Sequence, residues 1–186
     1  MKYEEFLQQQ SFDLQELIAF SYGRLIDDPP EGFDARLPAP PFLMVDRIVS
    51  IDSNGNKGGI VAEQDIRLDA WYFQCHFPDD PVQPGCLGVD AVWQLLGFYG
   101  VWRGGIGAGR ALGSEEVVFN GQIRPHNSVV RFEIDVIRFR DMKSSGSSIV
   151  MANASILADG EVVATIKKAR SGIFKGIAYK NYPYQE

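Results

Sequence analysis

His76 is the first candidate for acid–base chemistry, because it lies in an aromatic stretch with Phe73 and Phe77 close by. A protonated imidazole is poorly solvated in such surroundings, so burial is expected to favour the neutral base. An imidazole titrates at about pH 6.5 in water, which suits a general base that works near neutrality. The alternative for His76 is a core histidine whose ring is bonded to a backbone carbonyl.

Asp90 is the second candidate, since it is the only formal charge between Val82 and Trp102, in a segment otherwise built for burial. A buried, unpaired carboxylate is costly, so Asp90 must have partners or be neutral. Gln94 lies one helical turn later and can hydrogen-bond that carboxyl group on the same helix face. The alternative is a carboxylate near a helix start, where the macrodipole favours negative charge.

The bend before this helix could stabilise negative charge on oxygen. Pro81, Pro84 and Gly85 make a rigid entry that leaves the N–H groups of Gly85 and Cys86 without intrahelical partners. Taking a proton from the carbon next to a thioester carbonyl puts charge on the carbonyl oxygen, and one such donor contributes about 3 kcal/mol to holding it. Base, oxyanion donor and acid together fit the removal of a β-hydroxyl group from a thioester.

A long hydrophobic helix, predicted over residues 88–101, must position these groups. A helix that is apolar nearly all round has to be covered on all sides. Strand patterns precede and follow it, so we expect an α+β fold in which a curled antiparallel sheet wraps around the central helix. One sheet can leave a flank of the helix open, and a second copy of the chain is the simplest cover, which predicts a homodimer.

The strands are indicated by apolar and polar side chains that alternate, most clearly in residues 129–139. Asn54-Gly55 predicts a turn, and Asp159-Gly160 between two strand patterns is typical of a two-residue hairpin. The strands are expected over residues 42–51, 59–68, 111–120, 129–139, 147–157 and 162–169.

Residues 1–41 are expected to form a lead-in to a single domain that spans residues 1–186. Apolar side chains at helical spacing predict one or two short helices within residues 3–20, with Ser11 available as a cap. The prolines of residues 27–30 and 38–41 then force extended or turned chain. We expect this lead-in to wrap on the domain surface.

Composition excludes several classes of partner. The formal net charge is −6 and no run of lysines or arginines occurs, which argues against nucleic acid and against an anionic membrane surface. Residues 82–102 contain Asp90, glutamines and glycines, and so fail as a membrane span. Residues 1–10 lack the basic start and apolar stretch of a secretory signal, so we expect a cytoplasmic protein with Cys75 and Cys86 as reduced thiols.

Two other patterns predict no bound group. The glycine-rich residues 104–109 follow a helix, whereas a dinucleotide-binding fingerprint follows a strand and opens a helix. Cys75, His76, Cys86 and His126 match no standard zinc-binding spacing. We therefore expect neither a cofactor nor a metal. A cysteine at a helix N-terminus can be an activated nucleophile, so a mechanism using Cys86 is an alternative.

The segments around His76 and Asp90 belong to a set of longer sequence motifs that covers most of the chain. They are Cys75-His76-Phe77, Asp80-Pro81-Val82-Gln83-Pro84-Gly85-Cys86-Leu87-Gly88, Asp90-Ala91-Val92-Trp93-Gln94-Leu95, Leu37-Pro38-Ala39-Pro40, Leu43-Met44-Val45-Asp46-Arg47, Arg110-Ala111-Leu112-Gly113 and Gly172-Ile173-Phe174. In these motifs the chain resembles the β-hydroxydecanoyl-acyl-carrier-protein dehydratase/isomerase family of bacterial fatty acid synthesis. The resemblance implies a hot-dog fold and a homodimer, with a histidine of one subunit and an acidic residue of the other in each active site.

Carried over by position, the resemblance implies that His76 takes the α-proton of a β-hydroxyacyl thioester. Asp90 of the other subunit, held by Gln94, would handle the hydroxyl group that leaves as water. Gly85 N–H would polarise the thioester carbonyl. The rest of the implied oxyanion and substrate-binding set is Cys86, Val82 and Phe77.

Family-level features also bear on a second reaction, the isomerisation of trans-2-enoyl to cis-3-enoyl chains. Aspartate rather than glutamate at Asp90, together with the N-terminal extension, favours the branch that isomerises. Gln74, where the family pattern has a glycine, and Pro78-Asp79, which resembles the dehydratase-only branch, weaken that expectation. Dehydration is expected in either case.

The implied partner is acyl carrier protein, which is acidic. Because this chain has the same sign of charge, it needs a local basic patch to receive that partner. Ordinary solvated strand charges are the alternative for the candidate residues, which are Arg138, Arg140, Lys143, Lys167, Lys168 and Arg170.

Three other activities stay open on the sequence. A thioesterase or an enoyl hydratase would use the same fold, and a non-catalytic subunit could bind acyl groups without changing them. A binder has no need to bury a carboxylate, so the combination of His76, Asp90, Gln94 and Gly85 argues against the last of these.

Overall fold

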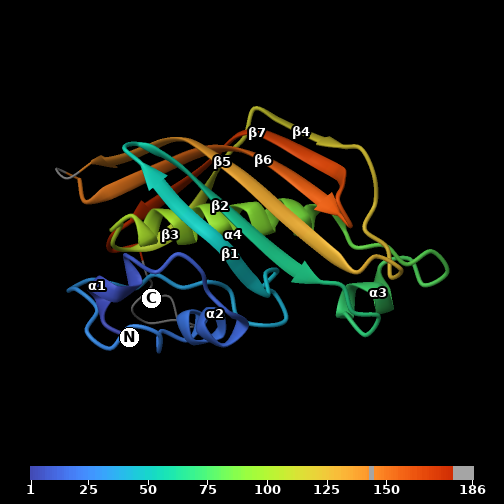
Figure 1. Ribbon diagram of the computed structural model, residues 1–186, viewed down its shortest axis with the longest axis horizontal. Helices are drawn as coiled ribbons and strands as arrows, with labels where there is room; N and C mark the ends of the chain where they lie inside the picture. Colours follow the sequence, from blue (N-terminus) through green and yellow to red (C-terminus); the bar gives the residue numbers. More distant parts are fainter. Residues whose placement is uncertain (143–144, 178–186) are drawn as a thin grey trace, which may run out of the picture.

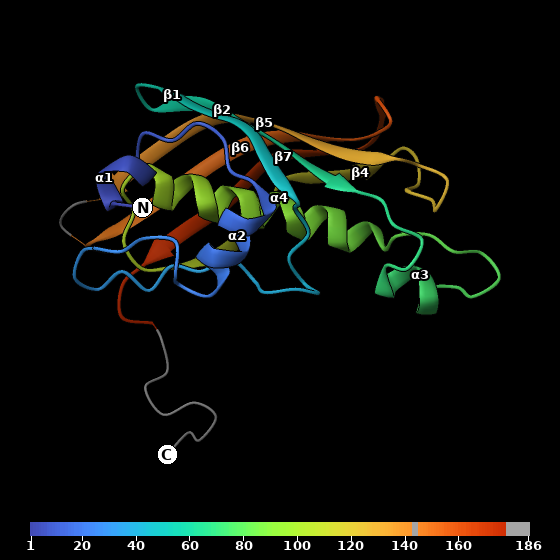
Figure 2. The same ribbon diagram turned by 60° about the horizontal axis from the view of Figure 1, so that its bottom comes forward.

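The computed structural model describes residues 1–142 and 145–177. Within them, a seven-stranded antiparallel sheet curls over one long helix, α4 (Figure 1). The N-terminal segment lies on the side of α4 that faces away from the sheet (Figure 2). The predicted α+β arrangement of a curled sheet around a central helix is therefore confirmed.

The helices are α1 (Tyr3–Phe6), α2 (Leu14–Ser21), α3 (Trp71–Cys75) and α4 (Gly85–Trp102). The strands are β1 (Arg47–Asn54), β2 (Lys57–Asp65), β3 (Ala108–Gly113), β4 (Glu116–Phe119), β5 (Val129–Met142), β6 (Ser147–Ala158) and β7 (Glu161–Phe174). They are ordered β1-β2-β5-β6-β7-β3 across the sheet, and β4 also pairs with β7.

The sheet has one face toward α4 and one face toward solvent, because side chains alternate along each strand. In β5 the side chains of Val130, Phe132, Ile134 and Val136 are buried. Asp159 and Gly160 join β6 to β7 with φ values of 48° and 90°, the left-handed conformation that a two-residue hairpin turn requires. The predicted hairpin is thereby confirmed.

Helix α4 carries the candidate residues and begins at Gly85, three residues earlier than predicted. Its less buried positions after Gly85 share one face, the open stripe, which consists of Cys86, Val89, Asp90, Trp93 and Gly97. The other positions of α4 from Leu87 onward are buried. Among the described residues, no helix combines the length and the apolar character that a membrane crossing requires.

The lead-in contributes to the core, which corrects the expectation that it wraps on the surface. Phe6, Phe12 and Phe20 are buried, and their rings lie 5.7, 4.9 and 5.1 Å from the ring of Phe98 of α4. Trp102 Nε1 donates to Gln9 O at 2.9 Å. The C-terminal half of α4 is thus covered by the chain's own N-terminus, and only the open stripe is left for another cover.

Several local predictions are wrong in position. Asp13, not Ser11, caps α2, since its side chain accepts a hydrogen bond from Glu16 N at 2.9 Å. The predicted strand over residues 111–120 is two strands, because the register of β3 on β7 shifts before Gly113, where φ is 127°. Helix α3 has no counterpart in the prediction, since Ala70 at its N-cap supplies no side-chain cap to mark its start.

Candidate active site

His76 follows the last residue of α3, and its ring is held by a backbone carbonyl. Its Nδ1 lies 2.9 Å from Val82 O. A carbonyl only accepts hydrogen bonds, so Nδ1 carries the hydrogen, and in a neutral ring Nε2 is then free to accept a proton. The hydrogen bond to a backbone carbonyl, which a core histidine would make, is therefore present. The ring, however, is half-buried and lines a pocket instead of lying in the core.

The pocket beside His76 has a volume of 440 Å³ and is lined mostly by apolar groups. Gly85 and Cys86, the first residues of α4, lie at its wall, and Pro84 before them offers no side-chain cap to their N–H groups. A Cβ at Gly85 would lie 2.6 Å from the ring of Phe119, so glycine permits this close approach. The N-terminus of α4, which has no side-chain cap, thus borders an apolar pocket.

Two further members of the predicted site lie beside His76. Val82 lines the pocket and holds His76. Phe77 has its ring centroid 4.2 Å from that of His76, is 57% exposed and has a φ of 59°. A bulky residue in this conformation is strained, which commonly marks a functional segment.

Asp90 is held by Gln94 as predicted. Gln94 Nε2 donates to Asp90 Oδ2 at 2.7 Å and to Phe42 O at 2.9 Å, while Gln94 Oε1 accepts from Met44 N at 3.1 Å. Because a backbone N–H only donates and a carbonyl only accepts, the amide orientation is fixed. Gln94 therefore presents a donor to the carboxyl group and ties it to the segment between the lead-in and β1.

Replacing Gln94 with leucine is expected to lower the free energy of unfolding by about 2–4 kcal/mol, because Met44 N–H and Phe42 C=O lose their partner in a buried place. Urea denaturation of the variant measures this loss. The matched control is Gln8→Leu, at an exposed glutamine, which is expected to change stability by about 0.5 kcal/mol or less. Equal stabilities of the two variants would contradict the assigned hydrogen bonds.

Within one chain, His76 and Asp90 line different pockets. Asp90 borders a space of 270 Å³ together with Trp93 and Gly97 of the open stripe, Leu37 of the lead-in, Phe42 and residues 109–111 of β3. Among the described residues, no side chain that lines this space also lines the pocket of His76. Each pocket of the single chain therefore holds one member of the acid–base pair.

The structure adds residues that the sequence did not single out. Gln83 is 3% exposed and lines the pocket of His76, with its Nε2 3.4 Å from Gln64 Oε1. Its position in the motif of residues 80–88 was the sequence feature that could have identified Gln83 as a site residue. Phe119 also lines the pocket, but the sequence marks it only as an apolar strand residue and not as part of a site. Burial raises the pKa of Tyr72 to about 12, so this neighbouring hydroxyl stays protonated near neutrality.

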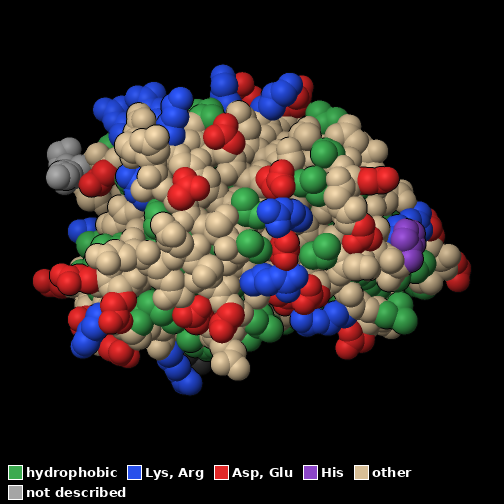
Figure 3. Space-filling model, in the orientation of Figure 1, with side chains coloured by type: hydrophobic (Ala, Val, Ile, Leu, Met, Phe, Trp, Pro, Cys, Tyr) green, Lys and Arg blue, Asp and Glu red, His purple; other side chains and the backbone are tan. Residues whose placement is uncertain are grey.

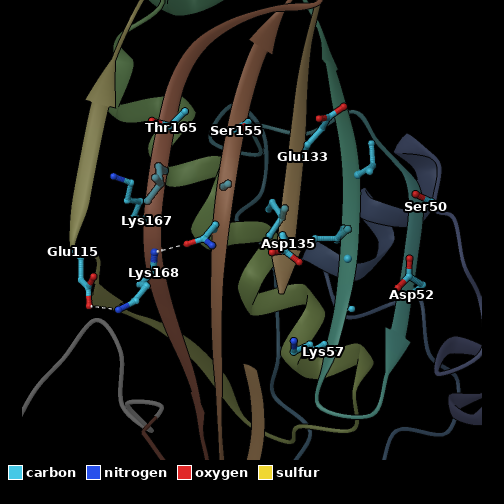
Figure 4. Close-up of a pocket in the computed structure, with 18 residues that line it drawn as sticks. Ser50, Asp52, Lys57, Glu115, Glu133, Asp135, Ser155, Thr165, Lys167 and Lys168 are labelled. Carbon is cyan, nitrogen blue, oxygen red and sulfur yellow. Dashed lines mark hydrogen bonds and ion pairs between the residues drawn. The ribbon is translucent and has the colours of Figure 1, made fainter. Parts of the chain in front are cut away.

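The predicted basic patch is divided. Lys168 pairs with Glu115 at 3.0 Å on the outer face of the sheet (Figure 4). Lys167 pairs with Glu116 at 2.6 Å. Lys143 lies outside the described residues. The remaining candidates line a separate hollow and are Arg138, Arg140 and Arg170.

Comparisons with known proteins agree with this architecture. Residues 37–167 match the model of the FabA-like domain. Among solved structures, the dehydratase heterocomplex ApeI:P from Xenorhabdus doucetiae is 14% identical with a TM-score of 0.53, over 76% of this chain and 86% of that chain. The PaaI protein of E. coli from the phenylacetic acid degradation operon is 16% identical with a TM-score of 0.47, over 72% and 82%. The chain therefore belongs to the FabA-like domain family, and its curled sheet around α4 is the hot-dog fold.

Proposed function

We propose that this chain is a dehydratase that converts a (3R)-hydroxyacyl thioester, carried by acyl carrier protein, into the trans-2-enoyl thioester. The observation that carries the proposal is His76, whose Nδ1 is bound to Val82 O beside the N-terminus of α4 in an apolar pocket. Membership of the FabA-like domain family supports it. No metal or cofactor is part of the proposal.

The reaction begins at His76 Nε2, which takes the α-proton of the bound thioester. The electron pair of the broken C–H bond moves onto the thioester carbonyl, and Gly85 N–H donates to that oxygen. The pair then forms the α,β double bond while the bond to the β-hydroxyl breaks. Asp90 gives the departing hydroxyl a proton, so that water leaves. Pre-aligned donors at developing charge lower such barriers most effectively in dry cavities.

The second part of the proposal is a homodimer in which Asp90 of one protomer completes the pocket of His76 in its partner. Asp90 is half-buried on the open stripe of α4, the one face of the helix that neither sheet nor lead-in fully covers. A second copy on this stripe would shield Trp93 and bring a carboxyl group to the other pocket. Such a dimer would also explain why His76 and Asp90 of the same chain line different pockets.

The assay is an incubation with a β-hydroxydecanoyl thioester of acyl carrier protein, followed by enoyl absorbance. The proposal expects an absorbance rise without release of free thiol. Thiol release would instead support a thioesterase, preference for coenzyme A an enoyl hydratase, and retention of unchanged thioester a binding subunit. Any of these three results in place of dehydration would overturn the proposal.

We further propose that the enzyme isomerises part of its product to the cis-3-enoyl thioester. Aspartate at Asp90 and the lead-in, which packs on α4 through Phe6, Phe12 and Phe20, support this. Separation of trans-2 from cis-3 products of a ten-carbon substrate tests it. A purely trans-2 product would contradict isomerisation and leave dehydration in place.

A further inference from the structure

Two buried glutamines beside the pocket of His76, Gln64 and Gln83, contact each other and are named the glutamine pair. Gln64 of β2 is 8% exposed and Gln83 is 3% exposed, and Gln83 Nε2 donates to Gln64 Oε1 at 3.4 Å. Gln64 shares the buried side of β2 with Ile60 and Ala62. The opposite, outer side differs, since Figure 3 shows acidic and basic side chains interspersed over β1, β2 and β5. The glutamine pair therefore places two amide groups where β2 otherwise presents apolar side chains.

The contact between the two amides is incomplete. The donor–acceptor distance of 3.4 Å is longer than the usual range of about 2.7–3.2 Å. Gln83 Oε1 is buried and has no hydrogen-bond partner among the described residues. A buried acceptor without a partner destabilises a fold, and two apolar side chains of similar size would avoid this loss. Stability therefore does not account for the glutamine pair, which points to a role in the neighbouring site.

Gln83 shares a peptide unit with Val82, the residue that holds His76. A peptide unit is planar, and its C=O and N–H groups point in opposite directions. On one side Val82 O lies 2.9 Å from His76 Nδ1, and on the other Gln83 N donates to Ile123 O at 2.9 Å. A rotation of this plane that releases Ile123 would also turn the carbonyl away from the ring. The orientation of His76 therefore depends on where Gln83 lies.

Few other groups hold this segment in place. The flanking residues Pro81 and Pro84 have no N–H to donate. Asp80 is ion-paired, but its side chain is 64% exposed, and exposed ion pairs contribute little to stability. The side chain of Gln83, by contrast, is anchored in the interior on Gln64, which belongs to a strand with neighbours on both sides. Because a paired strand is a rigid element, Gln64 gives the segment a fixed point.

We propose that Gln83 is a positioning residue, which acts through the peptide unit shared with Val82 to hold the ring of His76 with Nε2 free to take a proton. Gln64 supplies its anchor. The same contact places the start of α4, because Gly85 follows two residues after Gln83. The expected effect on turnover rests on the proposed function, whereas the expected effect on the orientation of the ring does not.

The test compares Gln83→Met, Gln64→Leu and the double variant with wild type. Each single substitution leaves one amide buried without its partner and is expected to lower Tm by about 3–6 °C. The double substitution removes both amides, so its Tm is expected to return to within about 2 °C of wild type or to exceed it. For a β-hydroxydecanoyl thioester of acyl carrier protein, kcat is expected to fall about 10-fold or more in all three variants, with KM changed less than about 2-fold.

The comparison of Tm with kcat separates a positioning role from a structural one. A glutamine pair that only stabilised the fold would let kcat return together with Tm in the double variant, which would overturn the proposal. A rise in KM at unchanged kcat would overturn it as well, because Gln83 would then be a substrate-binding residue. The control Gln15→Met, at an exposed glutamine of α2, is expected to keep the Tm and kcat of wild type.

Nitrogen NMR of the imidazole follows the ring without turnover. The chain contains two histidines, so in a His126→Ala background the signals of labelled histidine come from His76 alone. Because Val82 O only accepts, the neutral ring is expected to carry its hydrogen on Nδ1. Gln83→Met/Gln64→Leu is expected to show both tautomers, and an unchanged ring would contradict the positioning role. If wild type dehydrates no thioester while the tautomer still depends on the glutamine pair, the proposed function fails and the positioning role stands.

Discussion

Replacing His76 with alanine is expected to lower kcat/KM for a β-hydroxyacyl thioester by about 10³-fold, within the range that general acid–base groups contribute. Among the described residues that line the pocket, His76 alone carries an imidazole, and no carboxylate lines it. Val82 O orients the ring, and alanine removes it without filling the space. Enoyl absorbance under limiting substrate measures the effect.

The matched control is His126→Ala, at an exposed histidine in the turn that precedes β5. It is expected to retain wild-type turnover. Circular dichroism and denaturation midpoints confirm that both variants are folded. Turnover in His76→Ala within 10-fold of the His126→Ala value would remove His76 from the chemistry.

Replacing Asp90 with asparagine is the second substitution with a large expected effect, a loss of kcat/KM of about 10²-fold or more. Asparagine keeps the shape and can still accept the hydrogen bond from Gln94 Nε2, which lies 2.7 Å from the present carboxyl oxygen. It cannot give a proton to the departing hydroxyl. The fold should therefore persist while the second half of the reaction slows.

Asp69→Asn, at an exposed aspartate before α3, is the control for this loss and should turn over normally. The stability of Asp90→Asn should stay within about 1 kcal/mol of wild type, since the hydrogen-bond geometry is retained. A folded and fully active Asp90→Asn variant would show that Asp90 has a structural role on α4 and gives no proton in the reaction.

The sequence was sufficient for the central features of the fold because several of its signals agree. Alternation in β5, the Asp159-Gly160 hairpin and the apolar run of α4 each fix a local structure, and together they allow few topologies. Asp90 and Gln94 were linked correctly because residues four apart meet on a helix.

What sequence could not supply is long-range packing. Phe6, Phe12 and Phe20 look like the apolar face of a surface helix, and only the tertiary structure shows them buried on Phe98. Similarly, residues 42–46 have a strand-like pattern, but Phe42 O and Met44 N bond to the side chain of Gln94 instead of to a neighbouring strand.

The candidate site shows the same division. His76 and its neighbours were found because they lie within one short segment. The division of the basic residues was not predictable, since Glu115 and Glu116 of one segment neutralise Lys168 and Lys167 of another. Within the described part of the chain, Arg138, Arg140 and Arg170 form no ion pair; Arg138 and Arg170 are both paired with Met151 of β6, and Arg140 is paired with Ile149.

The most direct measurement of the central claim is complementation between two inactive proteins. His76→Ala and Asp90→Asn subunits are mixed under conditions in which labelled subunits are seen to exchange, and turnover is then recorded. If each active site combines the imidazole of one protomer with the carboxyl group of the other, each mixed dimer is expected to regain about half of its sites. Persistent inactivity after demonstrated exchange, with both parents folded, would contradict an active site shared between subunits.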